Sequence, residues 1–258
     1  SAENITWTGP FNPTANTEDE SNTLSLAKSD TDTAGNAGPA ATTANYAVDT
    51  LAPTVNIVAI SSASGVQNSL LNAGDNVSVT ATFSESVIVD NASGTPTLTL
   101  VVGSDNRTST YTSGSGSTPL VFQYTIQAGD NDTNGISIEA NTLALNSGTI
   151  RDAAGNNATI TYSSVSANTS YKVDNTAPSV DNFTLSDTAL KAGDTATVTL
   201  RFSEAVASFS SSADITVANG TLATMSSADN ITWTGTFTPT ANTEDDNNTL
   251  SLATSYTD

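Results

Sequence analysis

The sequence contains no cysteine, so no disulfide bond can stabilise it and no thiolate is available as a nucleophile or metal ligand. It also has no histidine, which removes the usual general base and the commonest transition-metal ligand. Only six basic residues stand against 26 acidic ones, and the net charge of −20 argues against nucleic acid or an anionic membrane as a partner. Catalysis would have to rely on a carboxylate pair. We therefore expect a protein that is not an enzyme.

Long apolar runs are missing as well. No segment approaches the roughly 20 apolar residues that a membrane-spanning helix needs, so we expect no direct insertion into a membrane. Such high polarity is also found in disordered chains. The regular spacing of the apolar residues in this sequence argues against disorder.

The sequence has internal repetition instead. Residues 1–32 recur as residues 227–258, with 25 of the 32 positions identical. A shorter motif, Val-Asp-x-x-Ala-Pro, stands at residues 48–53 and again 125 residues later at residues 173–178. Repetition at fixed spacing indicates an array of similar units. One unit would then span 125 residues and the other 101 (226 minus 125).

Apolar and polar residues alternate with a period of two, which is typical of strands with one buried face. The alternating segments include residues 77–83, 98–102, 120–126 and 198–202, and one segment around Trp7 is repeated around Trp233. About seven such strands in roughly 100 residues are typical of an Ig-type sandwich. We predict an all-β fold class of tandem Ig-like antiparallel β-sandwiches in an elongated array.

Proline interrupts a strand ladder and holds the preceding residue extended, so the Ala-Pro of the short motif suits a junction between units. Three domains follow from this spacing. Residues 1–50 are predicted to be the C-terminal part of an Ig-like domain, 51–175 a complete and longer one, and 176–258 the N-terminal part of another. Neither partial domain is expected to bury its apolar face alone, so each should need strands from elsewhere.

Three short motifs together resemble a known family. Phe-Ser-Glu closes a strand at residues 83–85 and 202–204, and Asp-x-Ala-Gly-Asn stands at residues 32–36 and 152–156, upstream of the linker motif. This set is similar to the bacterial Ig-like domains strung in tandem in large repetitive surface adhesins, which are often type I secreted and calcium-binding. The resemblance implies an extracellular location at a bacterial cell surface.

Ig topology brings three acidic positions to one end of the middle unit. The second strand ends where the linker arrives, and the loop before the last strand lies at that end, so Asp49, Glu85 and Asp152 should meet. Oxygen ligands without nitrogen or sulfur donors suit Ca²⁺. We therefore predict a Ca²⁺ site, to which Asn156 could add its side-chain carbonyl.

The next linker repeats the set as Asp174, Glu204 and Asp258, and Asp32 holds the corresponding place in the first unit. Acidic residues of the preceding unit could complete each coordination shell. These are residues 18–20 at the first junction, and Asp130 and Asp132 at the second.

Simpler interpretations stay open for each motif. Asp-x-Ala-Gly-Asn is also a good tight-turn sequence, and Glu85 and Glu204 could be solvated loop acids, as could the acidic run at residues 18–20. Trp7 and Trp233 are expected to pack in a sandwich core, with sugar stacking as the alternative.

Two functions remain. The first is that of structural extender repeats in a long adhesin or surface filament, stiffened by Ca²⁺ at the junctions and supporting cell adhesion or biofilm formation. Its partners would be neighbouring Ig-like repeats of the same protein or neighbouring copies. The alternative is a carbohydrate- or surface-binding module, including an ice-binding one.

Overall fold

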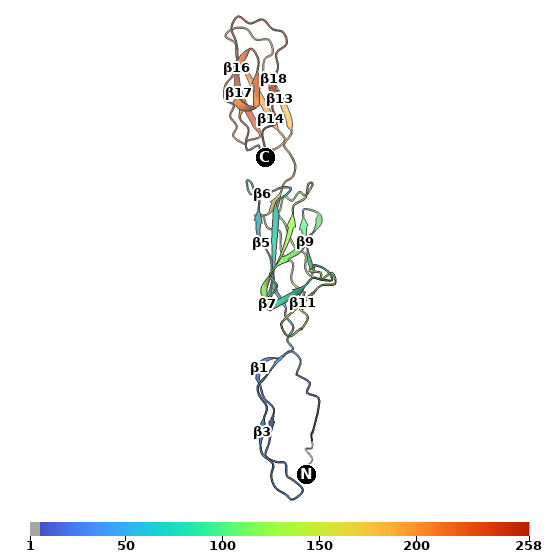
Figure 1. Cartoon of the computed structure of the whole chain (residues 1–258). Helices are drawn as coiled ribbons and strands as arrows, with labels where there is room; N and C mark the ends of the chain where they lie inside the picture. The colour runs from blue at the N-terminus through green and yellow to red at the C-terminus, as the bar shows by residue number, and fades with distance from the viewer. Residues whose placement is uncertain (1–5, 258) are drawn as a thin grey trace. The chain divides into compact units, whose positions relative to one another are not determined.

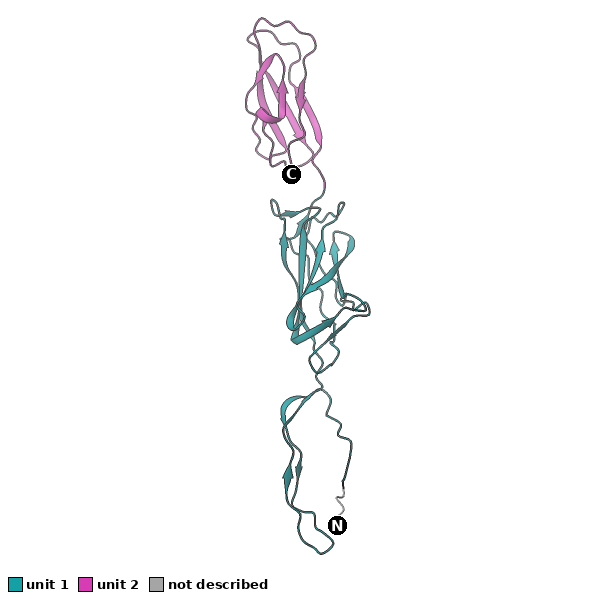
Figure 2. Cartoon of the chain, viewed as in Figure 1, with its two compact units in different colours: residues 1–175 teal, residues 176–258 magenta. Residues whose placement is uncertain are grey.

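A computed structural model describes residues 6–257 of the chain, which divide into two compact units, residues 1–175 and 176–258 (Figures 1 and 2). Nearly all of the regular secondary structure in both units is β-strand, and the longest α-helix among the described residues is one turn. The all-β prediction is therefore confirmed. Unit 1 contains β1 (Glu18–Asn22), β2 (Ser25–Leu26), β3 (Ala41–Thr42), β4 (Tyr46–Asp49), β5 (Val55–Ser64), β6 (Leu70–Leu71), β7 (Asn76–Asp90), β8 (Thr97–Val102), β9 (Asp105–Ser113), β10 (Ser117–Thr125), β11 (Thr149–Arg151) and β12 (Lys172–Val173). Unit 2 contains β13 (Val180–Leu185), β14 (Ala196–Phe202), α1 (Ser211–Asp214), β15 (Ile215–Val217), β16 (Gly220–Leu222), β17 (Thr232–Pro239) and β18 (Leu250–Leu252).

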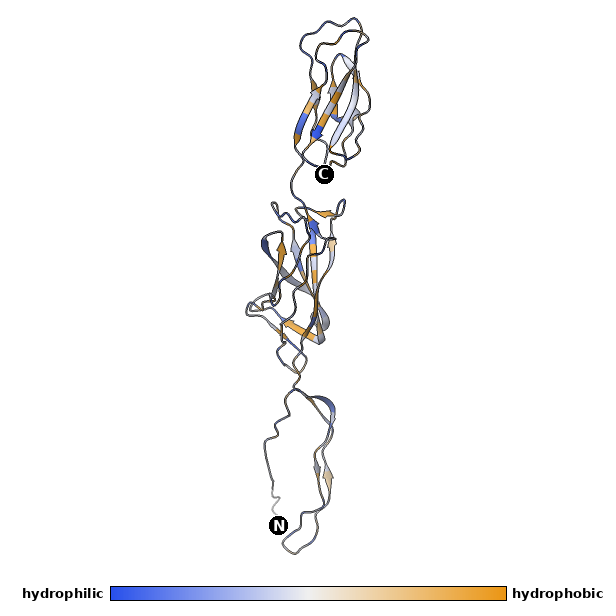
Figure 3. Cartoon of the chain, turned by 180° about the vertical axis from the view of Figure 1, so that it is seen from behind, coloured by the Kyte–Doolittle hydropathy of each residue, from blue (hydrophilic) through white to orange (hydrophobic). Residues whose placement is uncertain are grey.

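The main sheet of unit 1 is antiparallel and centres on β7, which pairs with β5 and β11 along one edge and with β10 along the other. Beyond β10 follow β9 and β8. The alternation predicted for residues 77–83 appears directly in β7, where buried and half-buried residues take turns. Hydrophobic and hydrophilic residues follow one another along the strands in the same way (Figure 3).

The core of unit 1 lies between this sheet and shorter segments of residues 136–143 and 162–173. Val79, Phe83, Leu100 and Phe122 are each at most 1 % exposed. We predicted antiparallel pairing, but some of the pairing is parallel. β6 and β12 pair in parallel, and so do Thr54 and Thr159, because the first and last segments of this domain run in the same direction where they meet.

Residues 6–50 have a different character. β1 pairs with β4 and β2 pairs with β3, but no residue in this stretch is buried. Trp7 is 91 % exposed, so residues 6–50 provide no core for it by themselves, and its packing in a sandwich core stays a prediction. This stretch does not bury its apolar side chains alone, as expected of a partial domain.

Unit 2 has a four-stranded antiparallel sheet in the order β13-β14-β17-β16, and a second pair of strands, β15 and β18. Val198, Leu200 and Phe202 are fully buried, and Phe202 packs against the rings of Phe209 and Tyr256. Unit 2 therefore buries its apolar face by itself, contrary to the expectation for residues 176–258. The reason is that residues 227–257 supply the covering strands from within the same unit. The three-domain division itself stays a prediction.

Candidate metal centre

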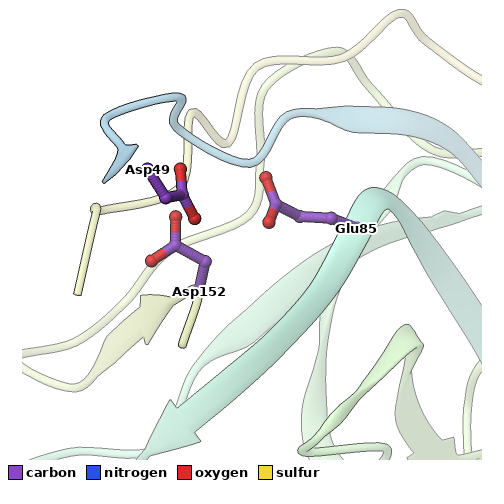
Figure 4. Close-up of side chains that lie close together, drawn as sticks. All are labelled: Asp49, Glu85 and Asp152. Carbon is purple, nitrogen blue, oxygen red and sulfur yellow. The ribbon is translucent and has the colours of Figure 1, made fainter. Parts of the chain in front are cut away.

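Three carboxylates from separate parts of unit 1 meet beside the first linker. Oxygen atoms of Asp49, Glu85 and Asp152 all lie within 4.8 Å of one another. Asp49 ends β4, Glu85 lies within β7, and Asp152 directly follows β11. Figure 4 shows the three side chains directed toward a common point. The structure thus brings together the trio that Ig topology predicted, and among residues 6–257 no other group of three such side chains is this close.

A tight turn positions Asp152. Its Oδ1 accepts a hydrogen bond from the backbone N–H of Asn156 and its Oδ2 accepts one from the Asn156 side chain, both at 2.8 Å. Gly155 closes the turn at φ +97°, in the left-handed region that glycine enters without steric cost. The turn interpretation of Asp-x-Ala-Gly-Asn is therefore correct. It leaves lone pairs on both carboxylate oxygens, so the turn and a ligand role are compatible.

The same turn recurs at residues 32–36. Asp32 accepts hydrogen bonds from Asn36 and Ala34, and Gly35 adopts φ +85°. Hydrogen bonds from the side chain and backbone of Asn36 lower the pKa of the Asp32 carboxyl. Asp32 is thus held in the ionised form and in the geometry of Asp152. Among residues 6–257 it belongs to no group of three such side chains.

A pair of hydrogen bonds that sequence reasoning missed positions Glu85. The N–H of Ser84 donates to the carbonyl of Thr54 (2.8 Å), and the N–H of Thr54 donates to Oγ of Ser84 (3.0 Å). Ser203 and Ser179 exchange the same two bonds in unit 2, at 2.8 and 2.9 Å. The serine of Phe-Ser-Glu therefore fastens the residue after Ala-Pro. In the sequence, only the recurrence of Phe-Ser-Glu at residues 83–85 and 202–204 could have indicated this pair of hydrogen bonds.

Burial and neighbouring negative charges both disfavour ionisation of Glu85, and burial is the larger cause. Burial raises the pKa of Glu85, and the charges of Asp152, Asp49 and Glu18 raise it further. Glu18 therefore lies close enough to influence the site, as expected for the first acid of residues 18–20. A divalent cation at this point would reverse the sign of the local field.

Asn156 lies at the site in a different orientation from the expected one. Its side-chain nitrogen donates to Oδ2 of Asp152 (2.8 Å) and more weakly to the backbone and side-chain oxygens of Asp49 (3.3 and 3.4 Å). The amide N–H₂ thus faces the carboxylates where we expected the carbonyl oxygen. The two ends of the amide have nearly the same shape, so rotation about the last side-chain bond would present the oxygen instead.

Each linker is fastened to the domain before it through the residue after Val-Asp. Oγ1 of Thr50 donates to the carbonyl of Thr14 (2.7 Å) and accepts from the N–H of Thr17 (3.0 Å). Asn175 occupies the same motif position. Its side chain accepts from Ala73 N–H and donates to the carbonyl of Asp130, both at 2.6 Å. Because Thr50 and Asn175 are different residue types, the sequence motif does not indicate that both bond the linker to the domain before it.

The expectation that Asp130 and Asp132 complete a second metal shell is wrong. Both are nearly fully buried and bonded inward. Asp130 accepts from Arg107 (2.6 Å) and Tyr124 (2.5 Å), while Asp132 accepts from the backbone N–H groups of Gly103, Asn134 and Gly135. These acids stabilise the loop that carries them.

The other predicted set stays a prediction. Asp174 belongs to unit 1 and Glu204 to unit 2, and Asp258 lies outside the described residues.

A groove of about 720 Å³ runs along β5 and residues 161–166. It is lined mainly by hydroxyl and amide side chains, and its one aromatic residue, Tyr162, is buried. The Tyr162 hydroxyl lies 2.7 Å from Oγ1 of Thr142. The groove therefore presents no open aromatic face on which a sugar could stack.

Residues 174–258 match the family model of the bacterial Ig-like domain. No curated protein and no solved structure matches the chain. In the described part of the chain, no helix has the length and apolar character required to cross a membrane. A bacterial Ig-like domain is a module of surface proteins, in line with the coarser part of the family resemblance.

Proposed function

We propose that this chain forms non-enzymatic structural extender repeats of a large extracellular adhesin or filament at a bacterial surface, stiffened by Ca²⁺ at the domain junction. The observation that carries the proposal is the meeting of Asp49, Glu85 and Asp152 within 4.8 Å beside the linker. The bacterial Ig-like match at residues 174–258 supports the surface role.

The donors fit calcium better than other ions. Ca²⁺ takes 6–8 oxygen ligands and tolerates irregular geometry, whereas Mg²⁺ demands a near-ideal octahedron. Three carboxylates, each able to offer one or two oxygens, cover a large share of that requirement. The raised pKa of Glu85, caused by burial and by its acidic neighbours, is a sign of negative charge without compensation. A bound cation would supply that compensation.

The chain's own residues prepare the junction for this role. The hydrogen bonds of Thr50 fasten the start of the linker to residues 14–17. Ser84 fastens Thr54 to β7 on the other side. Asp49 ends β4 directly before Thr50, and Glu85 and Asp152 belong to the domain that follows. A cation held by all three would cross-link the end of β4 to that domain.

Stiffening is useful to a protein that holds a binding domain away from a cell. Repeats that contact only their neighbours behave as a one-dimensional array. Bending at each joint adds to bending at the next, so every stiffened joint helps to keep a long chain extended. The partners in this proposal are neighbouring Ig-like repeats of the same protein. Cell adhesion and biofilm formation are the processes that such a stalk would support.

Thermal unfolding of the full chain tests the proposal. We expect a higher melting temperature in millimolar calcium than in EDTA, because a ligand that binds only the folded state at 100 times its Kd contributes about 2.7 kcal/mol. Glu85→Gln should abolish most of this difference. The matched control is Glu139→Gln, the same change at an exposed position of unit 1 outside the trio. Identical curves with EDTA and calcium would refute calcium stiffening.

A further inference from the structure

Two segments of unit 1, residues 54–71 and 159–173, are paired at both ends and separate in between. At one end Val55 N–H donates to the carbonyl of Thr159 (3.3 Å), and Thr159 N–H donates to the carbonyl of Pro53 (2.7 Å). At the other end β6 pairs in parallel with β12. The groove of about 720 Å³ is lined mainly by residues 55–58 and 161–166, which lie between the two paired positions. The groove is therefore built wholly from the interior of unit 1.

Along this groove β5 has an open edge. Its only ladder among the described residues is the one with β7, on its other edge. An antiparallel strand directs its N–H and C=O groups to alternate edges, so β5 presents backbone donors and acceptors toward the groove. Such an edge is a template for pairing with another chain. Register shifts between Val55 and Ile57 and between Ile60 and Ser62 limit the regular stretch to about four residues.

The opposite wall of the groove is held in place from its far side. Val165 and Ile138 exchange two backbone hydrogen bonds (2.8 and 3.0 Å), and Tyr162 N–H donates to Oδ1 of Asn141 (2.8 Å). The groove side carries small, exposed hydroxyl side chains, those of Thr161, Ser163, Ser164 and Ser166. Side chains of this size leave room for the backbone of a guest, and their hydroxyl groups can both donate to it and accept from it.

The groove combines an apolar surface with an absence of charge. Val58 and Tyr162 line it as buried residues, and Ile57 lines it while 57 % exposed. Among the described residues that line it, none is charged. A guest inside the groove must therefore be uncharged, because no opposite charge there would compensate the loss of water around an ion. Outside the groove the net charge of −20 favours the approach of a cationic segment.

We propose that this groove binds an extended segment of a partner polypeptide, which adds a strand to the open edge of β5. The guest has about four uncharged residues that favour strands, such as Thr and Val, flanked by Lys or Arg. Main-chain hydrogen bonds to β5 provide the affinity, and alternate side chains contact Ile57 and the hydroxyl wall. The proposal does not depend on the calcium site.

A folded second copy of this chain is a poorer guest. Among residues 51–257 the strands are already paired within their own sheets, so a copy would have to break one of its own ladders to supply a strand. Two copies also repel each other, because each carries a net charge of −20. A flexible cationic segment has neither disadvantage.

Fluorescence anisotropy with the full chain tests the proposal. The first probe is a labelled peptide, Lys-Lys-Thr-Val-Thr-Val-Thr-Lys-Lys, blocked at both ends. The second has the same sequence with N-methyl groups on the central residues, which removes backbone donors and keeps the side chains and the charge. We expect saturable binding of the first probe and at least about tenfold weaker binding of the second, because the main-chain hydrogen bonds are lost.

Two variants locate the binding. Ser164→Trp fills the groove and should abolish saturable binding of the first probe. Ser93→Trp, the same change at an exposed position of unit 1 outside the groove, should leave it unchanged. On the unmodified chain, the first probe should slow hydrogen exchange at residues 56–58.

Four results would overturn the proposal. They are the absence of saturable binding, equal affinities for the two probes, equal affinities of the two variants for the first probe, and protection from exchange only outside the groove. The last would show that the acidic surface attracts the peptide by charge alone. Both probes and the exchange measurement use the unmodified chain, so the test stands even if Ser164→Trp does not fold.

Discussion

Glu18 lies directly opposite Asp49 across the β1–β4 ladder. Like charges in this position destabilise an antiparallel pair. Burial raises the pKa of Glu85, and then the charges of Asp152, Asp49 and Glu18 raise it further. Glu18 therefore belongs electrostatically with the three carboxylates, although it lies in the segment before the linker.

The first prediction concerns Glu18. Glu18→Gln should stabilise the metal-free chain by about 0.2–1 kcal/mol, because it removes one of two opposed charges. Glu20→Gln, an equally exposed change on the same strand, is the control and should have little effect. Urea unfolding in EDTA measures both. Equal midpoints for Glu18→Gln and Glu20→Gln would show that the cross-strand repulsion is screened by water.

The second prediction concerns pH. The folded-state pKa of Glu85 is raised above its ordinary value of 4.5. The folded chain therefore binds the proton more tightly than the unfolded chain does. This group's stabilising contribution is complete below pH 4.5 and is lost as the pH rises through the higher folded-state value.

Metal-free chain should thus lose stability across this window, and Glu85→Gln should remove that part of the pH dependence. In calcium the trend should reverse, because the ion requires deprotonated carboxylates. Melting temperatures between pH 4 and 7, with and without calcium, provide the measurement. Parallel profiles for the two conditions would contradict the assignment of Glu85 as a ligand.

The third prediction concerns the buried group of Asp130, Tyr124 and Arg107. Burial and the hydrogen bond to Asp130 raise the pKa of Tyr124 to about 12. Tyr124→Phe should destabilise unit 1 by about 1.5–3 kcal/mol, the usual range for a hydrogen bond to a charged group. Tyr111→Phe is the matched control, because its hydroxyl accepts from the exposed N–H of Ser115. A smaller loss for Tyr124→Phe than for the control would contradict this prediction.

The fourth prediction concerns the fastening of the second linker. Asn175→Ala removes the acceptor of Ala73 N–H and the donors to the carbonyls of Gln127 and Asp130. Hydrogen exchange at Ala73 should accelerate, and stability should fall by about 1–3 kcal/mol, the cost of leaving such groups without partners. Thr161→Val, an exposed change in the same unit, provides the comparison. Unchanged exchange at Ala73 would show that water replaces the amide.

The sequence predicted the strands well where alternation is long. β7, β8, β10 and β14 coincide with the alternating segments, because a period of two together with Val, Thr and Phe leaves few alternatives. The meeting of Glu85 and Asp152 was predicted from an assumed Ig topology, on the premise that Phe-Ser-Glu closes a strand. That premise is right for β14, which ends at Phe202, and wrong for β7, which continues past Glu85 to Asp90.

Other features depended on information that the local pattern does not hold. Trp7 and Trp233 lie in nearly identical sequences, yet only the one with β14 beside it belongs to a strand. Asp130 and Asp132 have the composition of a metal loop, and only the tertiary fold shows that Tyr124, Arg107 and backbone N–H groups already occupy their oxygens. In both cases the structure depends on residues that are distant in the sequence: the neighbouring strand for the tryptophans, and the hydrogen-bond donors for the two aspartates.

The first linker has a consequence for durability outside the cell. Joints between domains are where proteases usually cut, because cleavage requires exposed and yielding backbone. Here the N–H of Leu51 is bonded to Asp49, the carbonyl of Pro53 accepts from Thr159 (2.7 Å), and both backbone groups of Thr54 are bonded to Ser84. Pro53 is buried as well. The linker therefore has little free backbone that could enter a protease active site. A surface protein with such linkers would resist proteolysis between its domains.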